Sequence, residues 1–190
     1  PTQKISTGRR ICPAFTASQR GLAYNPIADT YYVGGWNDRS LYEVAPNGQI
    51  LRSLRTELNT SGLAFNPTTG HLFVMANADT GLDVYVLDVG ADFAVVGGFN
   101  VDGMTGYAQA GLDMDCSGHL WAVNQVVQHV YQIESGESDA CAWRQIPWLS
   151  ISVSSGTIAA ASSQAVALTF DTNLAPVRYQ AQLRVRSSTP

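Results

Sequence analysis

The sequence Gly21-Leu22-Ala23-Tyr24-Asn25-Pro26 decides how the chain folds, because it occurs again as Gly62-Leu63-Ala64-Phe65-Asn66-Pro67. A looser third copy is Gly111-Leu112-Asp113-Met114-Asp115-Cys116. The copies begin at residues 21, 62 and 111, so they are 41 and 49 residues apart. Self-similarity at such a period is typical of repeat architectures, in which each repeat is one supersecondary unit. The sequence therefore predicts three structural repeats.

Each repeat continues with short runs rich in β-branched and aromatic residues, separated by turn formers such as Asn47-Gly48. Second runs begin near residues 30, 70 and 118, and third runs contain a tyrosine at positions 42, 85 and 131. The fourth runs are 50–54, 93–96 and 142–146. No window carries the apolar stripe of a helix. Four short strands per unit, repeated three times, predict an all-β fold of three four-stranded β-propeller blades.

The units resemble the NHL and YVTN-type propeller repeats of secreted bacterial proteins over about residues 20–145. The strand that begins at Gly21 and the following Tyr32-Val33-Gly34-Gly35-Trp36-Asn37 carry this resemblance, which is specific for a blade and not for an activity. We expect blades at about 20–58, 60–106 and 109–146, preceded by an N-terminal segment, 1–19. Closed propellers have roughly 4 to 8 blades, so three blades leave the ring open.

The composition changes at residue 147, where Ser, Thr, Ala and Val replace most charged residues. The runs 146–153, 155–160, 164–171 and 179–186 predict strands, the last through its strict alternation of apolar and polar residues. Residues 141–188 resemble BACON-like, immunoglobulin-like modules, with their Pro147-Trp148-Leu149-Ser150 opening and Ser155-Gly156-Thr157 turn. We therefore expect residues 147–190 to form a partial immunoglobulin-like β-sandwich segment.

The chain has three cysteines, Cys12, Cys116 and Cys141. Cys116 lies in the turn between the first two strands of the third repeat, and Cys141 comes just before the expected fourth strand. Both positions lie at the same end of an antiparallel blade, so we predict a disulfide between Cys116 and Cys141. Such a bridge implies an oxidising compartment. No partner is assigned to Cys12.

The net charge and the hydropathy of the chain argue against nucleic acid and membranes as partners. The net charge of -4 provides no general attraction to nucleic acid or to anionic lipid. No apolar run approaches the roughly 20 residues that span a bilayer, and residues 1–20 lack the pattern of a signal peptide. Because the chain also starts without Met, we expect a mature or excised piece of a longer secreted or cell-surface protein.

The candidate site residues are few. Asp113 and Asp115 replace Ala64 and Asn66 of the preceding repeat, and acidic groups on an innermost propeller strand are possible Ca²⁺ ligands or turn residues. His71, His119 and His129 are interpreted as structural. The aromatics Tyr24, Trp36, Phe65 and Trp121 fit either a sugar-binding face or the core between blades. No catalytic or cofactor-binding motif is recognised, so no catalytic or cofactor-binding residue is assigned.

The expected function is a non-catalytic extracellular binding or scaffolding module of a larger secreted bacterial protein. Similar modules are appended to secreted bacterial peptidases of the subtilisin type. Its expected partners are a protein or carbohydrate ligand, together with further blades of a parent chain or a second copy in a homo-oligomer. Two alternatives remain: a calcium-dependent hydrolase or lactonase of the six-bladed propeller type, and a structural subunit of a cell-surface assembly.

Overall fold

The structure is a computed structural model that describes residues 19–77, 81–104, 109–141, 148–153 and 156–171. All regular secondary structure within these ranges is β, without a helix. The part of the chain that is described therefore has no helix that could cross a membrane. The chain divides into two compact units, residues 1–143 and 144–190.

The first repeat forms a four-stranded antiparallel meander in the order β1 (Gln19–Asn25), β2 (Thr30–Gly35), β3 (Ser40–Val44) and β4 (Ile50–Arg55). The turn after β1 is built by Asn25, whose side-chain oxygen accepts hydrogen bonds from the backbone N–H groups of Ile27 and Ala28 at 3.0 and 3.2 Å. Asn side chains favour such turns because they bond to the backbone just after themselves.

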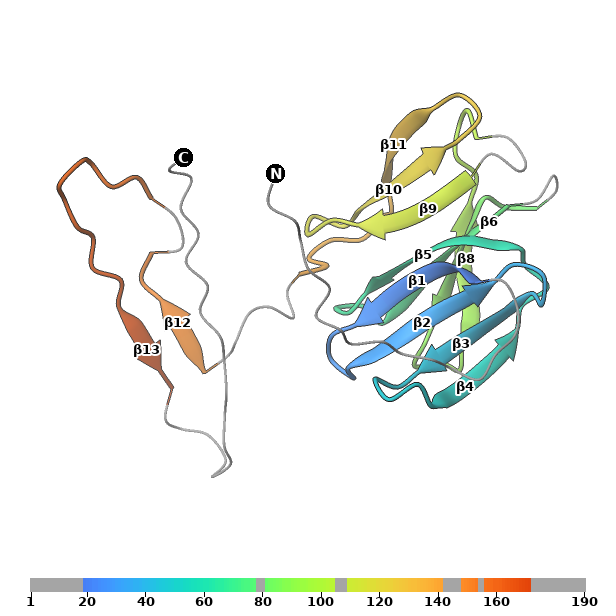
Figure 1. The fold of residues 1–190 in the computed structure, drawn as a ribbon, viewed down its shortest axis with the longest axis horizontal. Helices are drawn as coiled ribbons and strands as arrows, with labels where there is room; N and C mark the ends of the chain where they lie inside the picture. Colours follow the sequence, from blue (N-terminus) through green and yellow to red (C-terminus); the bar gives the residue numbers. More distant parts are fainter. Residues whose placement is uncertain (1–18, 78–80, 105–108, 142–147, 154–155, 172–190) are drawn as a thin grey trace. The chain divides into compact units, whose positions relative to one another are not determined.

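The second repeat has the same order and directions, and its strands are β5 (Thr60–Asn66), β6 (His71–Ala76), β7 (Val84–Asp88) and β8 (Ala94–Phe99). The third repeat forms β9 (Gln109–Met114), β10 (His119–Asn124) and β11 (His129–Glu134). Its predicted fourth strand, 142–146, lies outside the described residues, as does nearly all of the N-terminal segment. The three sheets follow one another in the chain and in space (Figure 1).

Two hydrophobic clusters hold the three sheets together. The first joins Ala23, Tyr32 and Leu41 of the first sheet to residues of the second: Leu63, Leu72, Val74, Leu87 and Phe93. The second joins the opposite face of the second sheet to the third and contains Ala64, Phe73, Met75, Val84, Leu112, Leu120 and Ala122. Within the described part of the chain, the middle sheet is thus covered on both faces, whereas each outer sheet is covered on one.

The recurring glycine of the repeat allows the innermost strands to approach closely. A Cβ atom on Gly21 would lie 2.7 Å from Cγ of Leu63, and one on Gly62 would lie 2.5 Å from the backbone nitrogen of Leu112. Neither position has room for a side chain without displacing its neighbour. The recurrence of glycine at this position therefore reflects contacts of β1 with β5 and of β5 with β9.

The second unit is smaller in its described part. The strands β12 (Leu149–Ile151) and β13 (Leu168–Phe170) pair antiparallel, and the rings of Trp148 and Phe170 stack with centroids 6.2 Å apart. The predicted strand over 155–160 was wrong for residues 156–160, and only 168–170 of the predicted run 164–171 is a strand. All of residues 156–171 are exposed, so they lack the buried face that stabilises a sandwich strand. The predicted strand 179–186 lies outside the described residues.

Candidate binding site at the innermost strands

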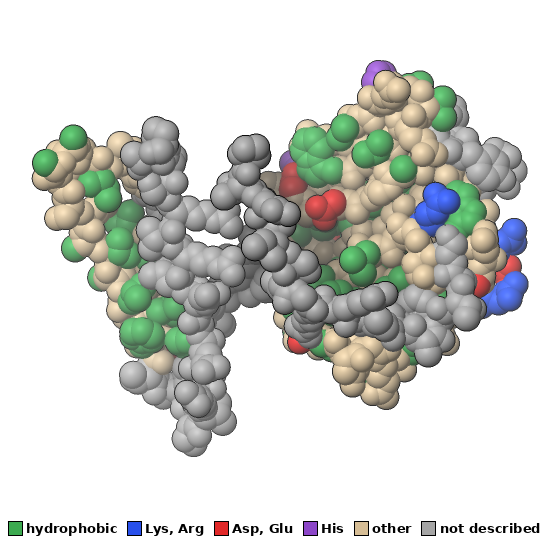
Figure 2. All heavy atoms as spheres, in the orientation of Figure 1, with side chains coloured by type: hydrophobic (Ala, Val, Ile, Leu, Met, Phe, Trp, Pro, Cys, Tyr) green, Lys and Arg blue, Asp and Glu red, His purple; other side chains and the backbone are tan. Residues whose placement is uncertain are grey.

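The first strands of the three repeats lie side by side, β1 next to β5 and β5 next to β9 (Figure 1). Beside them is a hollow of about 270 Å³, to which all three strands contribute. Its lining includes Leu22, Tyr24, Tyr31, Phe65, Asp113 and Met114. In Figure 2, acidic and apolar side chains lie together on the surface between β9 and β1.

Aromatic rings form one wall of the hollow. Tyr24 and Tyr31 are cross-strand neighbours in β1 and β2, with ring centroids 5.1 Å apart and planes tilted by 37°. The Tyr24 hydroxyl donates to Oδ1 of Asp29 at 2.9 Å, while 45% of the residue stays exposed. Phe65 packs against Tyr32 at 5.1 Å and so belongs to both the hollow and the core. The rings of this wall are held in place by the Tyr24 hydrogen bond and by the packing of Phe65, and Tyr24 remains accessible to a ligand.

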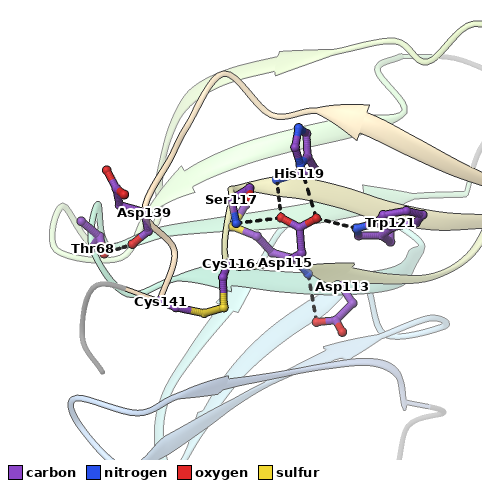
Figure 3. Close-up of a disulfide and its surroundings, with 10 residues drawn as sticks. Thr68, Asp113, Asp115, Cys116, Ser117, His119, Trp121, Asp139 and Cys141 are labelled. Atoms are coloured by element: carbon purple, nitrogen blue, oxygen red, sulfur yellow. Dashed lines mark hydrogen bonds and ion pairs between the residues drawn. A yellow bond between two sulfur atoms is a disulfide. The ribbon is translucent and has the colours of Figure 1, made fainter. Parts of the chain in front are cut away.

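Asp113 is the charged residue of the lining. It stands at the position of Ala23 and Ala64 in the other repeats, so the carboxylate is specific to the third repeat. Its Oδ1 accepts a hydrogen bond from the backbone N–H of Met114 at 2.9 Å, and the residue remains exposed. Figure 3 shows its side chain on the opposite side of the strand from that of Asp115. The hollow thus combines an aromatic wall with one exposed carboxylate.

Asp115, the second predicted metal ligand, organises a turn. Its Oδ1 accepts from the backbone N–H groups of Ser117 and His119 at 2.9 and 3.1 Å, and its Oδ2 accepts from the indole N–H of Trp121 at 2.9 Å (Figure 3). The Trp121 hydrogen bond, followed by the backbone hydrogen bonds, lowers the pKa of the Asp115 carboxyl. Asp115 therefore does for the third repeat what Asn25 and Asn66 do for the first two.

The two predicted calcium ligands point apart. Asp113 borders the hollow, whereas both oxygens of Asp115 accept hydrogen bonds from the adjoining turn and strand. Among the described residues, no group of three or more His, Cys, Asp or Glu side chains is arranged to hold a metal ion. Asp113 is thus the member of the pair that a ligand in the hollow can reach.

The structure contains the disulfide between Cys116 and Cys141, with a Cα–Cα distance of 4.8 Å (Figure 3). It ties the turn before β10 to the segment after β11, across the strands of the third sheet. Thr68, in the β5–β6 turn of the second sheet, donates to the backbone oxygen of Asp139 at 2.7 Å. The disulfide-closed loop is therefore attached to the neighbouring sheet.

Glu137 is the main contact of this loop, and sequence reasoning missed it. Its Oε2 accepts from the Asn66 amide at 2.7 Å and from the Thr69 hydroxyl at 2.8 Å, while its Oε1 pairs with Nδ1 of His71. The Glu137 side chain is only 13% exposed. The loops 45–49 and 89–93 follow the third strands of the first two repeats, but their sequences share no motif with this loop, so the pattern of the repeat could not reveal Glu137.

The remaining sequence candidates have structural surroundings. His119 lies between Asp115 and Glu134, with nitrogen–oxygen distances of 3.3 Å to each. His129 is exposed beside Tyr131 at a ring distance of 6.2 Å. Of the four aromatics considered for a sugar-binding face, Tyr24 and Phe65 line the hollow, while the Arg20 guanidinium lies over the Trp36 ring at 4.9 Å.

No family model and no curated protein matches the sequence. Among solved structures, a protein of unknown function from Bacteroides caccae matches with a TM-score of 0.48 and 22% identity, covering 62% of this chain and 46% of that one. A chain of a mitotic checkpoint complex matches with a TM-score of 0.50 and 9% identity, covering 62% of this chain and 36% of that one. Hydrazine synthase from Kuenenia stuttgartiensis matches with a TM-score of 0.43 and 12% identity, covering 68% of this chain and 38% of that one. This chain thus spans less than half of each, and at these identities the likeness concerns the fold alone.

Proposed function

We propose that the chain is part of a β-propeller in a secreted protein and serves as a non-catalytic binding module. The three successive antiparallel meanders, with their first strands side by side, support propeller blades of the NHL or YVTN type. The disulfide supports an oxidising, extracellular location. The paired strands β12 and β13 and the stacking of Trp148 on Phe170 support a BACON-like tail, as in accessory regions of secreted bacterial peptidases.

The hollow at the innermost strands is the observation that carries this proposal. It places the carboxylate of Asp113 beside an aromatic wall that includes Tyr24 and Tyr31. A cation is attracted both by a carboxylate and by the faces of aromatic rings. The ligand that this lining fits best is therefore a basic side chain, of Lys or Arg, presented by a partner protein.

Titration of the full chain with N-acetyl-arginine methylamide, followed by NMR, tests the proposal. We expect shifts of the Tyr24, Tyr31 and Asp113 resonances and weaker binding by about two- to fivefold in Asp113→Asn, because an ion pair with a carboxylate that water still reaches contributes about 0.5 to 1 kcal/mol. Asp102→Asn removes an exposed carboxylate that does not line the hollow, so it should bind like the wild type.

Two results would contradict the basic-ligand proposal. One is equal affinity of the wild type and Asp113→Asn for the arginine probe. The other is stronger binding of a neutral oligosaccharide such as maltohexaose at the same resonances, which would assign the aromatic wall to carbohydrate.

A calcium-dependent hydrolase is the second candidate, favoured by the position of Asp113 at the hollow. It needs a divalent ion there, held by oxygen ligands. A rise in melting temperature with millimolar Ca²⁺, abolished in Asp113→Asn and accompanied by lactone hydrolysis, would support it over the binding module. No calcium effect on either measurement would dismiss it.

A further inference from the structure

Among residues 19–77, 81–104 and 109–141, each outer sheet has one face that no other described sheet covers, and apolar residues lie on both of these faces. On the first sheet Leu22 is 64% exposed and Tyr24 45%, and their cross-strand partners are Val33 and Tyr31. On the third sheet Trp121 is 41% exposed and Val123 40%, on the face of the sheet that they share with Asp113. We call the first set, Leu22, Tyr24, Tyr31 and Val33, face A, and the second set, Gly111, Asp113, Trp121 and Val123, face B.

Face A repeats a surface that is already covered inside the molecule. The residues of the second repeat at these four positions are Leu63, Phe65, Leu72 and Val74. All four belong to or pack against the hydrophobic cluster between the first and second sheets. Face A is thus the surface with which a blade packs against the blade before it.

Face B repeats the complementary surface. The second-repeat residues at its positions are Gly62, Ala64, Phe73 and Met75. The last three belong to the cluster between the second and third sheets, and Gly62 lies against the backbone of β9. In both internal joints of this chain, therefore, a surface of type B meets a surface of type A.

We propose that face A of one copy of the chain packs against face B of a second copy, so that two chains close a six-bladed ring. Both halves of a joint that the molecule already uses twice are present and exposed on the same chain. Such head-to-tail contacts form a closed ring when their rotation closes, and six blades are within the usual range of roughly 4 to 8. The two proposals use the same residues, because Leu22, Tyr24 and Tyr31 of face A and Asp113 of face B also line the hollow, so a ligand there competes with closure of the ring.

Asp113 is the one departure from the pattern of face B, because it stands where the internal joints have Ala23 and Ala64. A carboxylate next to an apolar surface weakens the joint through desolvation. Asp113 borders the hollow, however, where water can still reach it. Its replacement by Ala is accordingly expected to tighten the association of two chains.

Sedimentation equilibrium of the full chain at micromolar concentration tests the proposal. We expect a mass of twice 20.4 kDa. Leu22→Glu damages face A, and Val123→Glu damages face B, so each variant alone should shift to monomer by at least about tenfold in dissociation constant. Val95→Glu, at an exposed position of β8 that belongs to neither face, is the matched control and should remain dimeric.

Mixing the two damaged variants distinguishes this joint from other modes of pairing. Leu22→Glu keeps an intact face B and Val123→Glu an intact face A, so an equimolar mixture should associate more strongly than either variant alone. Both side chains are well exposed, and circular dichroism melting of each variant checks that it remains folded. Since Trp121→Glu also alters face B, it provides a second variant if Val123→Glu unfolds.

Three results would overturn the proposal: a wild-type monomer, a series of masses above the dimer, or a Val123→Glu variant that dimerises as well as the wild type. The last would mean that face B takes no part in the contact between the two chains.

Discussion

Leu63 and Leu22 occupy the same position in consecutive repeats, and they differ in what covers them. Leu63 is 1% exposed between the first and second sheets, whereas Leu22 is 64% exposed on face A. Replacing each by Ala removes the same three carbon groups from the same position of a β-strand. The comparison therefore separates the effect of packing from that of local sequence.

The structure sets the size of the two effects. At about 0.8 kcal/mol for each buried carbon group, Leu63→Ala loses about 2.4 kcal/mol of transfer free energy, and the cavity that remains raises the expected loss to about 3 to 4 kcal/mol. Leu22→Ala should lose about 0.8 kcal/mol or less, because only about a third of the side chain is covered.

Urea denaturation followed by tryptophan fluorescence measures both losses. The two variants should be made in the Val123→Glu background, so that association of chains does not contribute to the free energy of unfolding. Equal losses for Leu63→Ala and Leu22→Ala would refute the reasoning, because they would mean that the first and second sheets do not pack through Leu63 or that face A is covered in solution.

Three further predictions concern contacts that lie away from face A. Replacing Cys116 and Cys141 by Ser should lower the free energy of unfolding by about 3.5 kcal/mol, because the bridge closes a loop with a sequence separation of 25 residues; a loss under about 1 kcal/mol in urea denaturation would contradict this. The Asp115 carboxyl should titrate in NMR with a pKa below that of an exposed Asp. The contribution of this carboxylate to the free energy of unfolding is therefore present above about pH 4 and is lost as the pH falls through the folded-state pKa. A titration of Asp115 at the ordinary pKa of an Asp would contradict this prediction. Glu43→Ala should lower the free energy of unfolding by about 2 to 3 kcal/mol, since the buried Glu43 carboxylate accepts hydrogen bonds from an arginine and a threonine. Glu57→Ala, which removes an exposed carboxylate, should change it by less than about 0.5 kcal/mol, and equal losses would disprove the assignment.

The repeat was sufficient to predict most of the β structure of the first unit. Gly62 recurs because β5 and β9 approach too closely for a side chain, and Asn66 recurs because its side chain builds the turn after the strand. Each of these physical requirements acts on a single position of each repeat. The recurring glycine and asparagine are therefore visible as a pattern in a single sequence. The strands between these positions can be predicted from the alternation of apolar and polar residues.

The candidate site was less predictable, because its residues are the ones in which the repeats differ. Nothing in the pattern distinguishes Tyr24, which remains exposed beside the hollow, from its equivalent Phe65, which also packs in the core. Glu137 lies in a loop whose sequence differs from those of the corresponding loops 45–49 and 89–93, and its partner His71 is a second-repeat residue 66 positions earlier. Contacts of this kind between repeats can be predicted only when the arrangement of the sheets in space is known.

Asp113 and Asp115 show why two substitutions within one repeat can have different meanings. Asp115 replaces an Asn whose side-chain oxygen accepts backbone hydrogen bonds, and a carboxylate oxygen accepts the same bonds, so the turn is retained. Asp113 replaces an Ala that packs between two sheets, and a carboxylate cannot reproduce that packing. A sequence that keeps the turn and gives up this packing still folds, because Asp113 lies on the exposed face of the third sheet. The same position decides both proposals: its charge is what a basic ligand would recognise in the hollow, and its departure from Ala is what limits the strength of the joint between two chains.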